Sequence, residues 1–262
     1  MLTVKDIAGA IEAFAPRSLQ ENYDNAGLQV GNPDMPVSAV LLCLDVTENV
    51  LREAAKRECN MIVSHHPLIF KGLKSLTGAD ATQRIVMEAL RLGIAIYSAH
   101  TNLDSVAEGV SYEMAHSLSL RDLQILAPKE NNPDAGLGVV GNTPSPIPSL
   151  EFLRKVKETF NVSDLRYSAQ SPQFVVRRVA LCGGSGSAFI KDAINADADI
   201  YISGDIRYHD FTTYGLDIII ADIGHYESEL CSRRILSKII RESFPECLAF
   251  FSESESNPVK TM

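Results

Sequence analysis

Short apolar runs alternate with amphipathic segments along the first half of the chain. We expect three buried strands here, at residues 40–44, 61–63 and 94–98. Residues 48–58 and 82–92 carry apolar side chains at helical spacing, and Gly93 directly after the second segment is typical of a helix end. Strands and helices that alternate in this order predict an α/β fold with a parallel sheet.

The same pattern returns in the second half, which indicates an internal duplication. Residues 179–182 and 200–203 read as strands, with a GGSG turn at 183–186 and a helix at 189–196 between them. Without gaps, VLLCLDVTENVLREAAKRECNMIVS superimposes on VALCGGSGSAFIKDAINADADIYIS, 139 residues further along. A repeat of this length predicts two similar α/β domains.

The third strands of the two copies also correspond. IAIYSAHTNLD aligns with IIADIGHYESE, which places His100 against His225 and Asp104 against Glu229. Both copies therefore carry a histidine and an acidic residue four positions apart, just beyond a strand.

Residues 127–148 are rich in Pro, Gly and Asn and separate the two copies. We take this stretch as the domain boundary, which gives a first domain at 1–126 and a second at 127–262. An amphipathic helix is expected at 150–160, and the polar tail at 252–262 is expected to fray.

Composition and charge indicate the compartment of the protein and limit the kinds of partner that it can bind. The five cysteines are scattered with no CxxC pair, which favours free thiols in a reducing compartment. We find neither a secretory leader nor an apolar run of about 20 residues, so a cytoplasmic protein is expected. A net charge of -9 without a run of Lys or Arg makes nucleic acid an improbable partner.

Four histidines follow predicted strand ends, where open parallel sheets bind ligands: His65, His66, His100 and His225. Taken alone, the adjacent pair is better explained by capping or hydrogen-bonded histidines. Because successive residues of an extended chain point to opposite sides, the pair would serve two neighbouring ions more easily than one. The spacing from His225 to Glu229 suits a metal chelate on one helix face, although it also occurs on solvated helices.

Together, the clusters are stronger evidence for a metal site than any one of them is alone. Three His or acidic clusters follow strand ends, and two of them occupy equivalent positions in a duplicated unit. Such an arrangement predicts a paired metal site in the cleft between the domains. Imidazole and carboxylate ligands without cysteine favour Zn, Mn, Fe or Ni over an all-oxygen Mg or Ca site.

Several motifs in this order resemble the GTP cyclohydrolase 1 type 2 homolog family, also called the Nif-three-like family, over nearly the whole chain. The motifs are YDNAGLQVG at 23–31, LDVT at 44–47, SHHPLIF at 64–70, AHTNLDS at 99–105, CGGSG at 182–186, SGDIRYHD at 203–210 and GHYESE at 224–229.

The resemblance implies two divalent ions per chain, held by His65, His66, Asp104, His225 and Glu229. It also implies that Glu229 bridges or approaches both ions, that His100 acts near the site as a supporting group or proton carrier, and that chains assemble into ring-shaped homohexamers. One departure is visible, since the family commonly has Gly-x-Gly-Arg-x-Gly where this chain has Val139 in place of the arginine.

Two functions follow as hypotheses. The first is a metal-dependent hydrolase, in which the ions activate water and polarise a small-molecule substrate, possibly a nucleotide. In this interpretation His100 relays a proton, and Asp205 or His209 orients ligands or substrate. A purely structural role of Asp205 and His209 as hydrogen-bonding partners explains these two residues equally well. The alternative is a non-catalytic ring that handles metal or binds protein partners.

Overall fold

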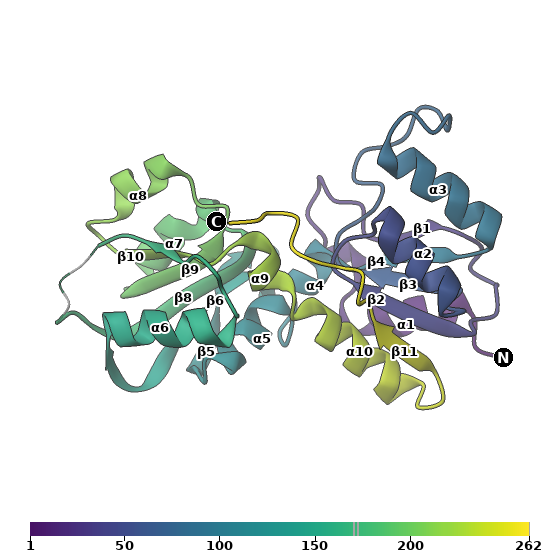
Figure 1. Cartoon of the computed structure of the whole chain (residues 1–262). Coiled ribbons are helices and arrows are strands. Elements are labelled where there is room, and N and C mark those ends of the chain that lie inside the picture. The colour runs from purple at the N-terminus through teal and green to yellow at the C-terminus, as the bar shows by residue number, and fades with distance from the viewer. Residues whose placement is uncertain (170, 172, 262) are drawn as a thin grey trace. The chain divides into compact units, whose positions relative to one another are not determined.

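The computed structural model describes residues 1–169, 171 and 173–261, and its chain divides into two compact units. Unit 1 comprises Met1–Leu103 and Ser232–Ser256, and unit 2 comprises Asp104–Cys231 and Asn257–Met262. Each unit is built around its own β-sheet (Figure 1). The α/β class expected from the sequence is confirmed.

Unit 1 contains a five-stranded sheet whose central strands are parallel. In spatial order the strands are β1 (Gly27–Val30), β4 (Ala95–Ser98), β3 (Met61–Ser64), β2 (Ala39–Cys43) and β11 (Leu248–Phe251). The edge strand β1 runs antiparallel to β4, and the other pairs are parallel. The predicted strands are therefore present, and their carboxyl ends lie along one edge of the sheet.

The helices of unit 1 cover both faces of its sheet (Figure 1). They are α1 (Val4–Phe14), α2 (Glu48–Lys56), α3 (Ala81–Leu92) and α10 (Ser232–Ser243), with the short α4 (Thr101–Asp104) after β4. Helices α2 and α3 bury their apolar faces in one core with the strands, whereas α1 and α10 contact each other. The side chains of Thr47 and Asp80 cap the first turns of α2 and α3, and Gly93 ends α3 in the left-handed conformation.

Unit 2 contains a six-stranded mixed sheet. Its strands, in spatial order, are β5 (Arg121–Lys129), β6 (Asn132–Pro148), β8 (Val175–Ser185), β9 (Ile200–Gly204), β10 (Ile219–Asp222) and β7 (Arg166–Tyr167). Strands β8, β9 and β10 are parallel, as the duplication requires. The helices are α5 (Val110–Ser117), α6 (Ser149–Thr159), α7 (Ile190–Asn195), α8 (Tyr208–Tyr214) and α9 (His225–Glu229).

The strand registers support the duplication and correct its third strand. Val40 lies opposite Met61 in unit 1, and Val179 lies opposite Ile200 in unit 2, so both strands keep the 139-residue offset. In the third strands, however, Ser98 and Asp222 occupy equivalent register positions, one residue off the gapless alignment. The second copy therefore has one extra residue between strand and histidine, in a loop that contains Gly224 at a φ of 87°.

The proline-rich stretch at 127–148 is not an irregular boundary, because it forms much of the β5–β6 hairpin. Two of its prolines, Pro144 and Pro146, fall where the register between β6 and β8 shifts, between Asn142 and Ile147. The compact units also differ from a division between residues 126 and 127, since β11 pairs with β2 and thereby returns the end of the chain to unit 1.

The polar tail expected to fray is fixed to unit 1 in its first part. The backbone N–H of Ser252 donates to Leu42 O, and the carboxylate of Glu255 accepts hydrogen bonds from the N–H groups of Leu44 and Asp45. Arg233 pairs with Glu255 at 2.9 Å. The polar residues that suggested fraying are hydrogen-bonding partners of the sheet.

Glu53 of α2 is the second anchor of this tail. Its buried carboxylate accepts hydrogen bonds from Ser252 Oγ and from the N–H groups of Glu253 and Ser254, and it pairs with Arg57. Burial alone would raise the pKa of Glu53, but these bonds outweigh it and lower the pKa to about 2.

Within the part of the chain that the structure describes, no helix is both long and apolar enough to cross a lipid bilayer.

The low pKa of Glu53 predicts how acid destabilises the fold. A carboxylate with a depressed folded pKa stabilises the native state fully above its unfolded pKa near 4.5, and this contribution is lost as the pH falls toward 2. We expect Glu53→Gln to lower the free energy of unfolding at pH 7 by about 1–3 kcal/mol and to flatten the loss of stability below pH 4.5. Urea denaturation followed by circular dichroism from pH 7 to pH 3 measures both effects. The exposed Glu58→Gln is the control, and equal acid sensitivity in all three proteins would contradict the assignment.

Candidate metal centre

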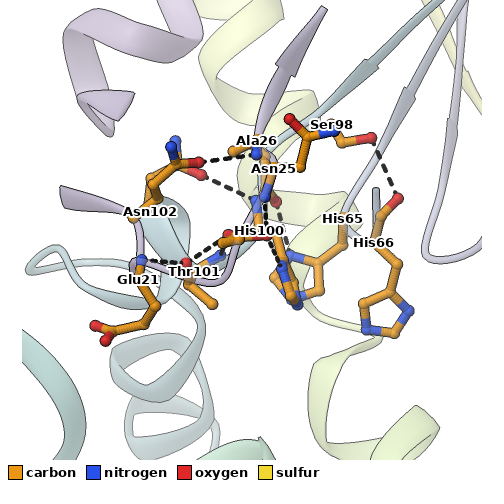
Figure 2. Close-up of polar contacts among 12 residues, drawn as sticks. Glu21, Asn25, Ala26, His65, His66, Ser98, His100, Thr101 and Asn102 are labelled. Carbon is orange, nitrogen blue, oxygen red and sulfur yellow. Dashed lines mark hydrogen bonds and ion pairs between the residues drawn. The ribbon is translucent and has the colours of Figure 1, made fainter. Parts of the chain in front are cut away.

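Three histidines of unit 1 form one cluster beyond the carboxyl ends of two neighbouring strands. His65 and His66 follow β3, and His100 follows β4. Their ring centroids lie 5.2–5.5 Å apart, and Figure 2 shows the three rings close together. One ligand nitrogen from each ring lies within 4.8 Å of the other two. Adjacent parallel strands thus bring together residues that are 35 positions apart in the sequence.

The adjacent histidines do not point to opposite sides, as an extended chain would require. Strand β3 ends at Ser64, and the chain bends at His65 and His66. The bend is held by Ser64 Oγ, which donates to His66 O at 2.8 Å, and by a hydrogen bond between the hydroxyls of Ser64 and Ser98. These bonds help to hold the bend from which both rings lie beside the His100 ring.

Each ring of the cluster is oriented through its Nδ1 atom. His65 Nδ1 lies 2.8 Å from Ala99 O, His66 Nδ1 lies 2.8 Å from the carboxylate of Asp45, and His100 Nδ1 lies 2.7 Å from the carboxylate of Asp24. Because carbonyl and carboxylate oxygens only accept hydrogen bonds, each Nδ1 must donate its proton. In the neutral ring this places the lone pair on Nε2, which is how metal-binding histidines are commonly arranged.

Asp24 is the most firmly held of these supporting groups. Its side chain is buried, and its second oxygen accepts hydrogen bonds from the N–H and hydroxyl of Thr101. Burial would raise the pKa of Asp24, but the hydrogen bonds from His100 and Thr101 outweigh it and lower the pKa to about 2. Asp24 therefore stays ionised at neutral pH and fixes the orientation of the His100 ring.

Unit 2 contains a second set of ligand groups, on and beside α9. His225 and Glu229 lie one helical turn apart, and His225 Nε2 is 2.9 Å from the Glu229 carboxylate. His225 Nδ1 lies 2.8 Å from Asp205, so this ring is also oriented by a carboxylate. Ligand oxygens of Asp104 and Glu229 lie within 4.8 Å of each other.

Two further residues of unit 2, Cys182 and His209, bear on this second set of ligand groups. Burial, followed by the nearby Asp104 and Glu229 carboxylates, raises the pKa of the Cys182 thiol, which therefore stays protonated. His209, considered with Asp205 as an orienting group, lies exposed on α8 with its ring against Tyr208.

Glycines make room for the unit 2 ligands. Gly184 has a φ of 64°, and a Cβ atom there would lie 2.1 Å from Glu229 Oε1. A Cβ atom at Gly204 would lie 2.7 Å from the backbone N of His225. The GGSG segment, predicted as a turn, instead continues strand β8 as far as Ser185. Its glycines keep space for the carboxylate of Glu229, which sequence reasoning did not foresee.

The site residues expected from the sequence thus occur in two sets, His65, His66 and His100 in unit 1 and Asp104, His225 and Glu229 in unit 2. Sequence reasoning missed Asp24 and Asp45, although both lie inside the YDNAGLQVG and LDVT motifs. Their roles depend on hydrogen bonds to histidines 76 and 21 positions away, for which local spacing gives no signal. The N and O donors with oriented imidazoles fit a divalent transition metal or zinc.

The chain belongs to the family described as Duf34/NIF3 (NGG1p interacting factor 3), whose model matches residues 2–258. A protein of Clostridium acetobutylicum named GTP cyclohydrolase 1 type 2 homolog is 36% identical over 240 residues, covering 90% of this chain and 89% of its own. A protein of the same name from Lactococcus lactis is 35% identical, with 98% of each chain covered. The crystal structure of a Staphylococcus aureus hypothetical protein superimposes with a TM-score of 0.91 at 25% identity, covering 99% of both chains.

The space around Glu229 gives a prediction for Gly184. We expect Gly184→Ala to displace the carboxylate and to strain the left-handed backbone, lowering the free energy of unfolding by about 1–3 kcal/mol. Thermal denaturation followed by circular dichroism measures this loss. Gly9→Ala is the matched control, because an added Cβ there meets no atom within 4 Å and an alanine in helix α1 should stabilise by about 0.5–1 kcal/mol. Equal effects of the two substitutions would contradict the close approach at Gly184.

Proposed function

We propose that the protein is a metal-dependent hydrolase with two divalent ions per chain. The observation that carries the proposal is that all four site histidines have Nδ1 against a fixed oxygen acceptor. Capping histidines need no such uniform arrangement, whereas metal ligands do, because Nε2 must present its lone pair. The ligands would be His65 and His66 from unit 1 and Asp104, His225 and Glu229 from unit 2.

The chemistry divides between the ions and the side chains. Bound divalent ions would supply Lewis-acid activation of water and polarisation of a substrate oxygen. The chain supplies orientation, through Asp45 behind His66 and Asp205 behind His225. Because these carboxylates accept hydrogen bonds from Nδ1, Nε2 is the ring nitrogen left for a metal ion.

His100 is proposed as the proton carrier. Its Nδ1 proton is held by Asp24, and its ring lies beside the His65 and His66 rings within the cluster. A histidine held by an ionised carboxylate is well placed to accept a proton at Nε2 and to release it again. A supporting or ligating role of the same ring is the alternative for His100.

The substrate class is proposed from the relatives. Proteins named GTP cyclohydrolase 1 type 2 homolog cover most of this chain, which supports a nucleotide as the first substrate to test. Val139, which occupies the position where related chains commonly carry arginine, is buried in β6. Any phosphate group would therefore be recognised by other residues. We further propose a cytoplasmic homohexamer.

Metal content is the first test. We expect about two ions per chain by elemental mass spectrometry of protein purified without chelator, and a loss of metal in His66→Ala and Glu229→Gln, because each variant removes one proposed ligand. His116→Ala is the matched control, since this exposed histidine pairs with Glu108 outside both ligand sets. Protein that stays metal-free after addition of Zn, Mn, Fe or Ni would exclude the hydrolase.

Turnover separates the hydrolase from a non-catalytic ring that handles metal or binds partners. With each candidate metal, we expect hydrolysis of a nucleotide or phosphoester in a substrate screen. Asp104→Ala should reduce kcat at least about a hundredfold while the mass in analytical ultracentrifugation stays that of a hexamer. Stoichiometric metal together with no turnover on any substrate in the wild type would favour the non-catalytic ring.

A further inference from the structure

Two exposed aromatic side chains lie beside the histidine cluster of unit 1. Tyr23 is 64% exposed and Phe70 is 45% exposed, and their ring centroids are 6.4 Å apart. The Phe70 ring also meets the His100 ring edge to face, with 6.2 Å between centroids. The Phe70 ring therefore lies between the His100 ring and the exposed Tyr23 ring.

This pair is fixed to the cluster through its own chain neighbours. Tyr23 directly precedes Asp24, which holds the His100 ring, and Phe70 lies four residues after His66. The segments that carry the two aromatic rings are also tied to each other. Asn25 Nδ2 donates to Ile69 O at 2.6 Å, and the Ile69 N–H donates to Gln29 Oε1 at 3.2 Å.

The arrangement is more specific than a hydrophobic surface patch. Solvent-exposed apolar residues are common singly, but these two rings form a tilted pair beside the polar cluster. Hydrogen bonds also hold both segments that carry them. A rigid aromatic ring with an exposed face binds another planar ring by stacking. In a chain of net charge -9, the segment 67–79 beside Phe70 carries two lysines and no acidic residue. A small molecule that carries both an aromatic ring and negative charge is therefore compatible with this surface.

We propose that Tyr23 and Phe70 form a stacking surface for the planar aromatic ring of a small-molecule substrate, and this inference rests on the proposed function. The surface would place the ring of the substrate beside the His65, His66 and His100 cluster. Asp24 then serves both parts of the site, since it orients His100 and is joined directly to Tyr23.

Binding of guanosine monophosphate to zinc-loaded protein tests the proposal by calorimetry, with ribose 5-phosphate as the probe that lacks an aromatic ring. We expect Tyr23→Leu and Phe70→Leu each to weaken binding of guanosine monophosphate about five- to a hundredfold, and Phe70→Tyr to restore it. Binding of ribose 5-phosphate and the metal content should not change. The control is Tyr167→Leu, whose side chain is 46% exposed on strand β7 of unit 2.

Other outcomes overturn the inference. If guanosine monophosphate binds no better than ribose 5-phosphate, or if both leucine variants bind it like the wild type, the aromatic pair is not a stacking surface. A change of oligomeric mass in Phe70→Leu with unchanged nucleotide affinity would assign the pair to an interface between chains instead. The proposed hydrolase fails separately, through absent metal or absent turnover, and these measurements do not depend on either aromatic residue.

Discussion

The hydrogen bond from each histidine Nδ1 to a fixed oxygen is the constraint on which the candidate metal centre depends. For His65 the acceptor is a backbone carbonyl just beyond β4, and for His66, His100 and His225 it is a carboxylate of another loop. Each bond fixes both the tautomer and the direction of a ring. The loops that carry these acceptors must therefore be held as firmly as the histidines themselves.

The parallel sheet of unit 1 supplies that rigidity. Its strands end at one edge, where the hydroxyls of Ser64 and Ser98 join β3 to β4. Asp45 follows β2 at the same edge, and its backbone N–H is held by Glu255 from the tail. Burial raises the pKa of Glu255, while hydrogen bonds from Asp45 and Leu44 and the charge of Arg233 oppose the shift. The end of the chain thus stabilises the segment that orients His66.

Local pattern was sufficient to predict the parallel strands shared by the two copies and helices α2, α3, α6 and α7, but not β1, β11, α1 or α10. It also marked the His and acidic clusters, whereas their assignment as metal ligands came from the family resemblance and stays a prediction. Apolar runs mark β2 and β3, and histidines directly after strands mark the site, because these signals lie within a few residues of one another. The β5–β6 hairpin was missed because prolines and glycines resemble a linker when the pairing partner is unknown. Asp24 and Glu53 were missed for the same reason, since their roles come from bonds to residues distant in sequence.

The duplication shows how a single residue changes the use of a repeated motif. Both copies have a histidine and an acid four positions apart, but α4 begins only after His100, whereas α9 begins at His225 itself. Within α9 the two side chains therefore share one helix face and meet at 2.9 Å. In the first copy, His100 lies outside the helix, and its Nδ1 atom is directed at Asp24. In both copies the helix begins three residues after the end of the strand, at Thr101 after Ser98 and at His225 after Asp222. The extra residue in the Gly224 loop therefore moves the histidine into the first position of the helix.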